Sequence, residues 1–333
     1  MITWKKITNQ THKGVTPLGK VAFIFPGQGS QKVGMGKDLV EEFNECKSIF
    51  ETADAQVGLN LSDIIFNGND EDLTVTYHAQ PAILTTSIAL LEKIKEAGIK
   101  ADYVAGHSLG EFSALVASGA ISFEDGVKLV HKRGLLMDKA VPVGQGAMAA
   151  VLFLAPEKIE EVVSEVNKQG HSVGIANYNS PTQVVITGDA PGVQLASGLI
   201  KEAGAKRVLP LKVSGPFHSS LMKPASEEFE NELGKINVDT CSIPVISNVT
   251  AKAITEADEI KELLVKQLFS PVKWNQSIQE LVDLGVDTFV EIGPGKVLTG
   301  LVKAISPSSK LVNVYDVETL KQFLNEWEEI KSC

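Results

Sequence analysis

Ser108 stands between two glycines in the pattern Gly-x-Ser-x-Gly, in the segment Gly106-His107-Ser108-Leu109-Gly110. A short apolar run over residues 102–106 precedes the serine, and a helical pattern follows it. Glycine on both sides permits a sharp strand-to-helix turn that exposes a serine hydroxyl at a helix N-terminus. The pattern therefore predicts a nucleophilic serine for acyl transfer or ester hydrolysis.

The same serine has a simpler interpretation as a helix cap. Ser108 and Glu111 are three residues apart, which is the spacing of a capping box that only starts a helix. The preceding strand and the paired glycines favour the nucleophile. The cap stays open as the alternative at this point.

A nucleophilic serine needs a base, and histidine is suited to that role near neutral pH. His218 lies in the loop SGPFHSSLM, after a predicted strand and before a predicted helix. Loops at strand ends are where catalytic groups gather in α/β sheets, so His218 is the favoured base. His78 precedes a predicted helix and is not excluded. The remaining histidines stand in the polar leader, inside the serine turn, beside charged helical residues or after a glycine: His12, His107, His131 and His171.

Arg133 interrupts an apolar row on a helix predicted over residues 123–137. The 3,4,3 spacing places it on one helix face with Gly126, Leu129 and Leu136. An arginine in such a row needs a buried anion or a route to water. Two interpretations stay open, an internal salt bridge and a clamp that binds a substrate carboxylate through paired hydrogen bonds.

A glycine loop, residues 27–31 (GQGSQ), follows the first buried strand and invites a nucleotide-binding interpretation. Lys32 stands where the dinucleotide-binding pattern needs glycine, and residues 36–38 lack the serine or threonine of a phosphate-binding loop. The loop could instead offer backbone N–H groups to an oxyanion, with a purely structural turn as the commoner explanation.

The segments that position these residues predict an α/β fold. Over residues 20–141 and 214–333, short buried strands alternate with glycine-rich turns and helices, which indicates a mainly parallel sheet. Residues 142–213 have their own order of elements, βαββαβ, which is the ferredoxin-like arrangement. We therefore expect a large α/β domain interrupted by a small subdomain, after a polar N-terminal extension at residues 1–19.

Composition excludes several classes of protein. Apolar residues make up 44% of the 333-residue chain and charged residues 22%, the balance of a soluble globular protein. The net charge of −10 disfavours non-specific binding to nucleic acid or to an anionic membrane. The three cysteines lie far apart, so we expect no disulfide framework, no zinc site and a reducing, cytoplasmic location. No stretch has the length of a membrane span or the apolar block of a signal peptide.

Six segments, in order, resemble the malonyl-CoA:acyl carrier protein transacylases and the related acyltransferase domains of polyketide synthases. They span nearly all of the chain after the leader, and six ordered matches are far more specific than one serine motif. The segments are FPGQGSQ at 25–31, GHSLGE at 106–111, Arg133 in HKRG, GPFHSSLM at 215–222, QLFSPVKW at 267–274 and EIGPGKVLTGL at 291–301.

The resemblance implies an α/β-hydrolase-like large domain with a parallel sheet, interrupted by a ferredoxin-like (βαββαβ) subdomain. It implies Ser108 as the nucleophile, His218 as the base and Arg133 as the partner of the malonyl carboxylate. It also implies that the backbone carbonyl of Gln267 orients His218, the role that an acidic residue has in most hydrolases.

Three further positions follow from the same resemblance. The backbone N–H groups of Gln28 and Leu109 would form the oxyanion hole. Phe217, just before the histidine, would leave little room for the extra methyl group of a methylmalonyl substrate, a selectivity limited to about 1–3 kcal/mol.

The implied activity is ping-pong transfer of a malonyl group from malonyl-CoA to the phosphopantetheine thiol of an acyl carrier protein, supplying fatty acid synthesis. No metal or redox cofactor is expected, and an acidic carrier would dock on a local cluster of lysines and arginines. One alternative is a discrete acyltransferase that serves a polyketide carrier. Others are an ordinary serine esterase and a catalytically silent protein that binds the carrier.

Overall fold

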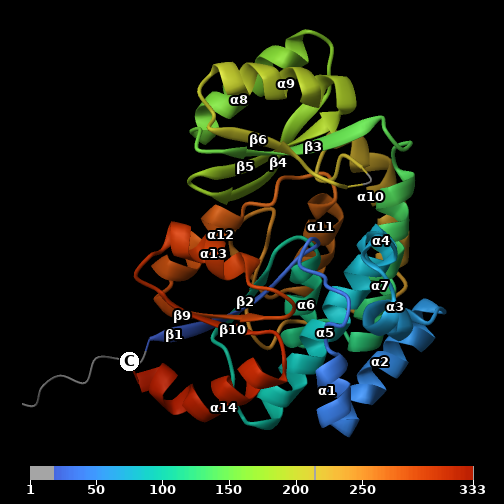
Figure 1. The fold of residues 1–333 in the computed structure, drawn as a ribbon, viewed down its shortest axis with the longest axis vertical. Helices are drawn as coiled ribbons and strands as arrows, with labels where there is room; N and C mark the ends of the chain where they lie inside the picture. The colour runs from blue at the N-terminus through green and yellow to red at the C-terminus, as the bar shows by residue number, and fades with distance from the viewer. Residues whose placement is uncertain (1–18, 214, 333) are drawn as a thin grey trace, which may run out of the picture.

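The computed structural model of the protein describes residues 19–213 and 215–332. Except for Gly19, the predicted N-terminal extension lies outside this part of the chain. A large α/β domain forms the lower part of the molecule in Figure 1, and a smaller unit of four strands and two helices lies above it. The chain leaves the large domain after α7 (Phe123–Lys139) and returns to it before α10 (Lys223–Leu233).

Within the described residues, six strands of the large domain form one sheet in the order β10-β9-β1-β2-β7-β8. Neighbours from β10 to β7 are parallel, and β8 alone is antiparallel. The mainly parallel sheet predicted from sequence is therefore confirmed. Phe25 at the end of β1 lies opposite Gly106 at the end of β2, so the glycine loop and the serine motif leave the sheet side by side. The strands are β1 (Lys20–Phe25), β2 (Tyr103–Gly106), β7 (Val245–Ile246), β8 (Ala253–Ile254), β9 (Val286–Ile292) and β10 (Lys310–Val314).

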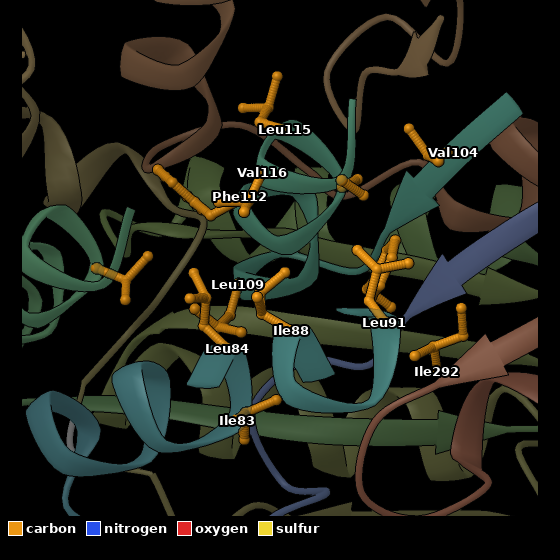
Figure 2. Close-up of a cluster of buried hydrophobic side chains, with 14 of the residues drawn as sticks. Ile83, Leu84, Ile88, Leu91, Val104, Leu109, Phe112, Leu115, Val116 and Ile292 are labelled. Carbon is orange, nitrogen blue, oxygen red and sulfur yellow. The ribbon is translucent and has the colours of Figure 1, made fainter. Parts of the chain in front are cut away.

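Two helices form the centre of the large domain. Every residue of α6 (Leu109–Ala117) is buried, and α5 (Thr76–Glu96) is buried over most of its length. A helix that is apolar all round belongs inside a core; Figure 2 shows the side chains of α5 and α6 meeting beside Val104 and Ile292 of the sheet. No helix among the described residues is long and apolar enough to cross a membrane. The other helices of this domain are α1 (Lys37–Glu42), α2 (Asn44–Val57), α3 (Leu61–Asn67), α4 (Asp70–Thr74), α7 (Phe123–Lys139), α10 (Lys223–Leu233), α11 (Ala257–Gln267), α12 (Trp274–Asp283), α13 (Val297–Ile305) and α14 (Val317–Ser332).

The small subdomain is an antiparallel sheet with its own apolar core. Its strands lie in the order β4-β5-β3-β6, and the two helices pack on the face turned away from the large domain (Figure 1). This is the ferredoxin-like arrangement expected from βαββαβ. Apolar side chains from α8 and α9 fill the space against β3, β4 and β5. The elements are β3 (Gly146–Leu152), α8 (Pro156–Lys168), β4 (Val173–Ser180), β5 (Gln183–Asp189), α9 (Ala190–Glu202) and β6 (Arg207–Pro210).

The two units are joined beside the predicted nucleophile. The backbone of β4 pairs with the segment before α12, because Tyr178 N–H donates to the Val272 carbonyl at 2.9 Å and Val272 N–H donates to the Ala176 carbonyl at 2.8 Å. Beside this junction, Met148 of β3 belongs to one apolar cluster with Phe217 of the large domain. The inner face of the small sheet therefore closes over the region that contains His218.

Candidate active site

The Ser108 turn is strained, and the two flanking glycines make it possible. Ser108 has φ 51° and ψ −103°, a conformation that costs a non-glycine residue about 1–3 kcal/mol. A side chain at Gly106 would overlap the backbone of Gly110, and one at Gly110 would overlap the carbonyl of Phe25. Glycines at both positions let α6 begin directly against the ends of β1 and β2. The hydroxyl is thereby raised above the carboxyl edge of the sheet.

The capping interpretation of Ser108 is wrong. The residue occupies the N-cap position of α6, but its side chain makes no capping hydrogen bond. Glu111, the expected capping partner, binds instead to the side chain of Gln267 at 2.7 Å and the backbone N–H of Asn248 at 3.3 Å. The Ser108 hydroxyl is thus free of the helix and available for other contacts.

His218 lies beside that hydroxyl. Its Nε2 is 2.8 Å from Ser108 Oγ, and its Nδ1 is 2.8 Å from the backbone carbonyl of Gln267. A carbonyl only accepts hydrogen bonds, so Nδ1 carries the proton and Nε2 is left to accept one from Ser108. Burial, and next the charge of Arg133, lower the pKa of His218 to about 3. The imidazole is therefore neutral and placed as a base.

The other histidines of the described residues have different hydrogen-bond partners. His107 binds the side chain of Asn179 at 2.8 Å, although its ring lines the same cavity as Ser108. His78 does not precede a helix as expected, because α5 begins at Thr76 and includes it. The partners of the other three are the carbonyl of Asp72 for His78, the carbonyl of Tyr77 for His131 and the carboxylate of Asp189 for His171. His12 lies outside the described residues.

Arg133 is fully buried in α7 and points at the same hydroxyl. Its Nη2 lies 3.1 Å from Ser108 Oγ and 2.8 Å from Gln267 Oε1, and its Nη1 lies 2.8 Å from Gln80 Oε1. These acceptors are neutral, and within the described residues Arg133 forms no ion pair, so the internal salt bridge is not what holds it. Burial lowers the pKa of Arg133 to about 10, which leaves it charged at neutral pH, and its Nε has no partner among the described residues. A buried cation with unused hydrogen-bonding capacity suits an incoming carboxylate.

Side-chain amides hold the turn, and the sequence interpretation missed them. Asn248 Oδ1 accepts from Ser108 N–H at 2.7 Å, and its Nδ2 donates to the Gly106 carbonyl at 2.7 Å. The side chain of Gln267 donates to the Ser108 carbonyl at 3.0 Å. Gln80 was missed as well. Asn248 directly follows the strand pattern IPVIS, a signal that could have placed it at the carboxyl edge of the sheet.

A cavity of about 300 Å³ opens over these groups, between the two units. The backbone N–H groups of Gln28 and Leu109 face no hydrogen-bond partner within the described residues, and both residues line the cavity. Leu109 is the first residue of α6, where helix N–H groups favour negative charge. The lining residues are Gln28, Gly29, Gln31, Thr74, His107, Ser108, Leu109, Arg133, Met137, Met148, Asn177, Leu211, Lys212, Val213, Phe217 and His218.

Phe217 narrows the cavity on the side of the small subdomain. The ring is 5% exposed and belongs to an apolar cluster with Met137 and Met148, which also line the cavity. The structure thus brings Ser108, His218, Arg133 and Phe217 together, with Gln267 behind them. Phe217 therefore narrows the space beside the Ser108 hydroxyl.

The chain matches the model of one protein family, described as the acyl transferase domain, over residues 22–320. It is 53% identical over 312 residues to a protein of Bacillus subtilis named malonyl CoA-acyl carrier protein transacylase. That alignment covers 94% of this chain and 98% of the relative.

Solved structures agree with this match. A crystal structure of an acyl carrier protein S-malonyltransferase from Vibrio cholerae has a TM-score of 0.88 at 45% identity, covering 91% of this chain and 99% of that one. A malonyl-transacylase in complex with its type II polyketide synthase acyl-carrier protein has a TM-score of 0.89 at 42% identity, covering 92% of this chain and 99% of that one. The likeness therefore extends over both units of the fold.

Proposed function

The chain belongs to the acyl transferase family, and from that premise we propose that it transfers a malonyl group from malonyl-CoA to the phosphopantetheine thiol of an acyl carrier protein. The observation that carries the proposal is the meeting of three groups at one atom. Ser108 Oγ lies within hydrogen-bond reach of both the His218 base and the Arg133 cation. A serine and a base would also serve an esterase, but a buried cation at the nucleophile favours an acyl group that carries its own carboxylate.

In the first half-reaction, Ser108 Oγ attacks the thioester carbonyl carbon of malonyl-CoA while its proton passes to Nε2 of His218. The N–H groups of Gln28 and Leu109 stabilise the negative oxygen of the tetrahedral intermediate. The carbon–sulfur bond then breaks, and His218 returns the proton to the departing thiolate of coenzyme A. A malonyl ester of Ser108 remains, with its carboxylate bound by Arg133.

In the second half-reaction, the carrier's phosphopantetheine thiol attacks the ester carbonyl. His218 takes the thiol proton and passes it to Ser108 Oγ as the ester bond breaks, which regenerates the free hydroxyl. The Gln267 carbonyl accepts a hydrogen bond from Nδ1 of His218, so Nε2 is the atom that gains and loses the transferred proton. Lys212 is exposed at the cavity, and we propose that it is part of the basic cluster that binds the carrier.

The proposal also includes the cofactor requirement and the cellular location of the protein. Serine, histidine and backbone N–H groups supply a nucleophile, a base and an oxyanion site, so the reaction calls for no metal or redox cofactor. We place the protein in the cytoplasm, supported by free thiols at Cys46 and Cys241.

We further propose that the carrier belongs to fatty acid synthesis. One structural relative is bound to a polyketide carrier, so a polyketide carrier is the alternative that has to be tested. A panel of purified holo carrier proteins of both kinds, offered to the malonylated protein, separates them by the rate of thiol malonylation. A polyketide carrier served at least tenfold faster would overturn the assignment to fatty acid synthesis.

The decisive experiment is intact-protein mass spectrometry after mixing with malonyl-CoA. We expect one malonyl adduct per chain, discharged by a holo carrier protein but only slowly by water. Digestion and peptide mass spectrometry should locate it on the peptide that contains Ser108. An adduct on another residue would refute the role of Ser108. Rapid hydrolysis of malonyl-CoA without a carrier would instead indicate an esterase.

A further inference from the structure

A buried acidic residue lies behind the catalytic groups and has no part in the mechanism above. Glu111 is 1% exposed and stands in the first turn of α6, three residues after Ser108. Its Oε2 accepts hydrogen bonds from Gln267 Nε2 at 2.7 Å and from the backbone N–H of Asn248 at 3.3 Å. A buried carboxylate is costly unless it is hydrogen-bonded. The loop that follows β7 and the end of α11 therefore hold this one oxygen in place.

The bond to Gln267 determines which way its amide faces. Gln267 Nε2 donates to Glu111 and to the Ser108 carbonyl, while its Oε1 accepts from Arg133 Nη2 at 2.8 Å. A rotated amide would set its NH2 group against the guanidinium and its oxygen against two acceptors. Glu111 and the Ser108 carbonyl thus enforce one orientation, and Glu111 supplies the shorter bond of the two.

That orientation in turn places Arg133. Two neutral amide oxygens, from Gln80 and Gln267, receive its Nη1 and Nη2 groups. Glu111 itself forms no ion pair with Arg133 within the described residues, so the guanidinium keeps its charge uncompensated by direct contact. The chain of contacts runs from Glu111 to Gln267, then to Arg133 and to the Ser108 hydroxyl.

We propose that Glu111 is a positioning residue that acts through the side chain of Gln267 to hold Arg133 ready for the carboxylate of the acyl group. It sets the preference for malonyl over neutral acyl groups without touching the substrate. The inference rests on the proposed function, because it concerns the same acylation of Ser108.

The test compares two acyl groups on variants of this residue. Glu111→Leu removes the acceptor, and Glu111→Gln keeps an acceptor oxygen at the same position. Single-turnover formation of the Ser108 ester is measured with malonyl-CoA and with acetyl-CoA. We expect Glu111→Leu to lower malonylation on the order of 100-fold, as a misplaced positioning group does, but acetylation by less than about tenfold. Glu111→Gln should recover malonylation to within about tenfold of the unmodified protein.

A double-mutant cycle asks whether the effect passes through Gln267. Gln267→Leu removes the amide but keeps the backbone carbonyl that orients His218. We expect the Glu111→Leu/Gln267→Leu protein to malonylate within about threefold of the slower single variant, because residues in one hydrogen-bond network are not additive. The proposal would be overturned if the double variant lost malonylation rate by the product of the two single-variant losses. It would also be overturned if Glu111→Leu left the ratio of malonylation to acetylation rates unchanged.

Glu291 provides a matched control. It is another fully buried carboxylate, bound to the N–H groups of Leu298 and Thr299 at the start of α13. Glu291→Leu should lower thermal stability and leave the ratio of malonylation to acetylation rates unchanged. If Glu291→Leu changed that ratio as much as Glu111→Leu does, the role of Glu111 would be structural only.

If Glu111→Leu does not fold, Glu111→Asp, which withdraws the carboxylate by one methylene group, replaces it in the test. Failure of the unmodified protein to form any malonyl ester would refute the proposed function itself, separately from this inference.

Discussion

The guanidinium of Arg133 and the imidazole of His218 meet at the same atom, Oγ of Ser108. Nη2 of Arg133 lies 3.1 Å from that oxygen and Nε2 of His218 lies 2.8 Å from it. The hydroxyl accepts from the cation and donates to the base, so both bonds form together. The cation favours the developing alkoxide and disfavours protonation of the base. The guanidinium that we propose binds the malonyl carboxylate therefore adds to burial in keeping the imidazole of His218 neutral.

The first prediction concerns the pH dependence of acylation. Burial, then the charge of Arg133, lower the pKa of His218 to about 3 from an ordinary value of 6.5. The base is thus unprotonated above that pH, and Glu111, with a pKa of about 7, offers Gln267 an acceptor oxygen in either protonation state. Malonylation of Ser108 should therefore stay nearly constant from about pH 8 to about pH 5. Rapid-quench single turnovers across this range measure it. A histidine with an ordinary pKa would instead lose about tenfold in rate at pH 5.5, and that loss would contradict the placement of His218.

The second prediction is that Arg133→Ala separates the two acyl groups. Two charge-assisted hydrogen bonds to the malonyl carboxylate are worth about 3 kcal/mol or more, so malonylation should fall roughly 100-fold or more. Acetylation, which lacks the carboxylate, should fall much less. The acidic limb of the pH profile should also move to higher pH, because removal of the cation raises the pKa of His218.

Arg133→Lys provides the control for charge alone. A lysine keeps the positive charge but presents one ammonium group where the guanidinium has a planar fork. We expect the pH profile of Arg133→Lys to have its acidic limb near that of the unmodified protein. Its malonylation rate should lie between those of Arg133→Ala and the unmodified protein. Equal losses for malonyl and acetyl groups in Arg133→Ala would eliminate the carboxylate clamp.

The sequence predicted the groups that touch the hydroxyl because each lies in a segment with a local signal. The turn at Ser108 is marked by its glycines, and Arg133 stands out as a charge in an apolar helical row. The alternation of strands and helices was enough to place the parallel sheet and the inserted antiparallel one. His218 could be favoured from its loop, but only the fold brings it across 110 residues to Ser108.

The supporting amides could not be predicted in the same way. Asn248 and the side chain of Gln267 bond to the backbone of the serine turn from 140 and 159 residues away. The strand pattern before Asn248 indicates a place at the carboxyl edge of the sheet, but nothing in either segment indicates which backbone groups the two amides bind. The strand pattern over residues 243–249 extends further than β7, which ends at Ile246. Asn248 lies beyond that end, where its side chain bonds to Ser108 and Gly106 instead.

The third prediction links Glu111 to stability. Burial raises the pKa of Glu111 to about 7 from 4.5, so between these values the folded protein holds a proton that the unfolded chain has lost. The contribution of Glu111 to the free energy of unfolding therefore falls as the pH rises from about 4.5 to about 7. Glu111→Gln removes the titration, and its melting temperature relative to the unmodified protein should rise from pH 5 to pH 8. A pH-independent difference between the two proteins would contradict it.

The fourth prediction distinguishes two serines of one segment. Ser108→Ala should abolish the malonyl adduct, because no other nucleophile among the described residues lies within hydrogen-bond reach of His218 Nε2. Ser113, five residues after Ser108 and inside α6, is fully buried, and its hydroxyl has no partner among the described residues. Ser113→Ala should therefore keep the adduct and preserve or slightly raise stability. Mass spectrometry and thermal melts of both variants provide the comparison, and an adduct that persists in Ser108→Ala would indicate another nucleophile.

The fifth prediction is that Phe217 limits the size of the acyl group. Its ring lines the cavity beside His218, and one extra methyl group in such a pocket is worth about 1–3 kcal/mol, or roughly 10–200-fold in rate. Phe217→Leu should bring malonyl and methylmalonyl rates closer by about tenfold or more, measured as kcat/KM for each coenzyme A ester. Met222→Leu, in the same apolar cluster but not lining the cavity, should leave the ratio unchanged. If both variants preserve it, the methyl group is excluded elsewhere, and Phe217 serves only to pack the junction between the two units.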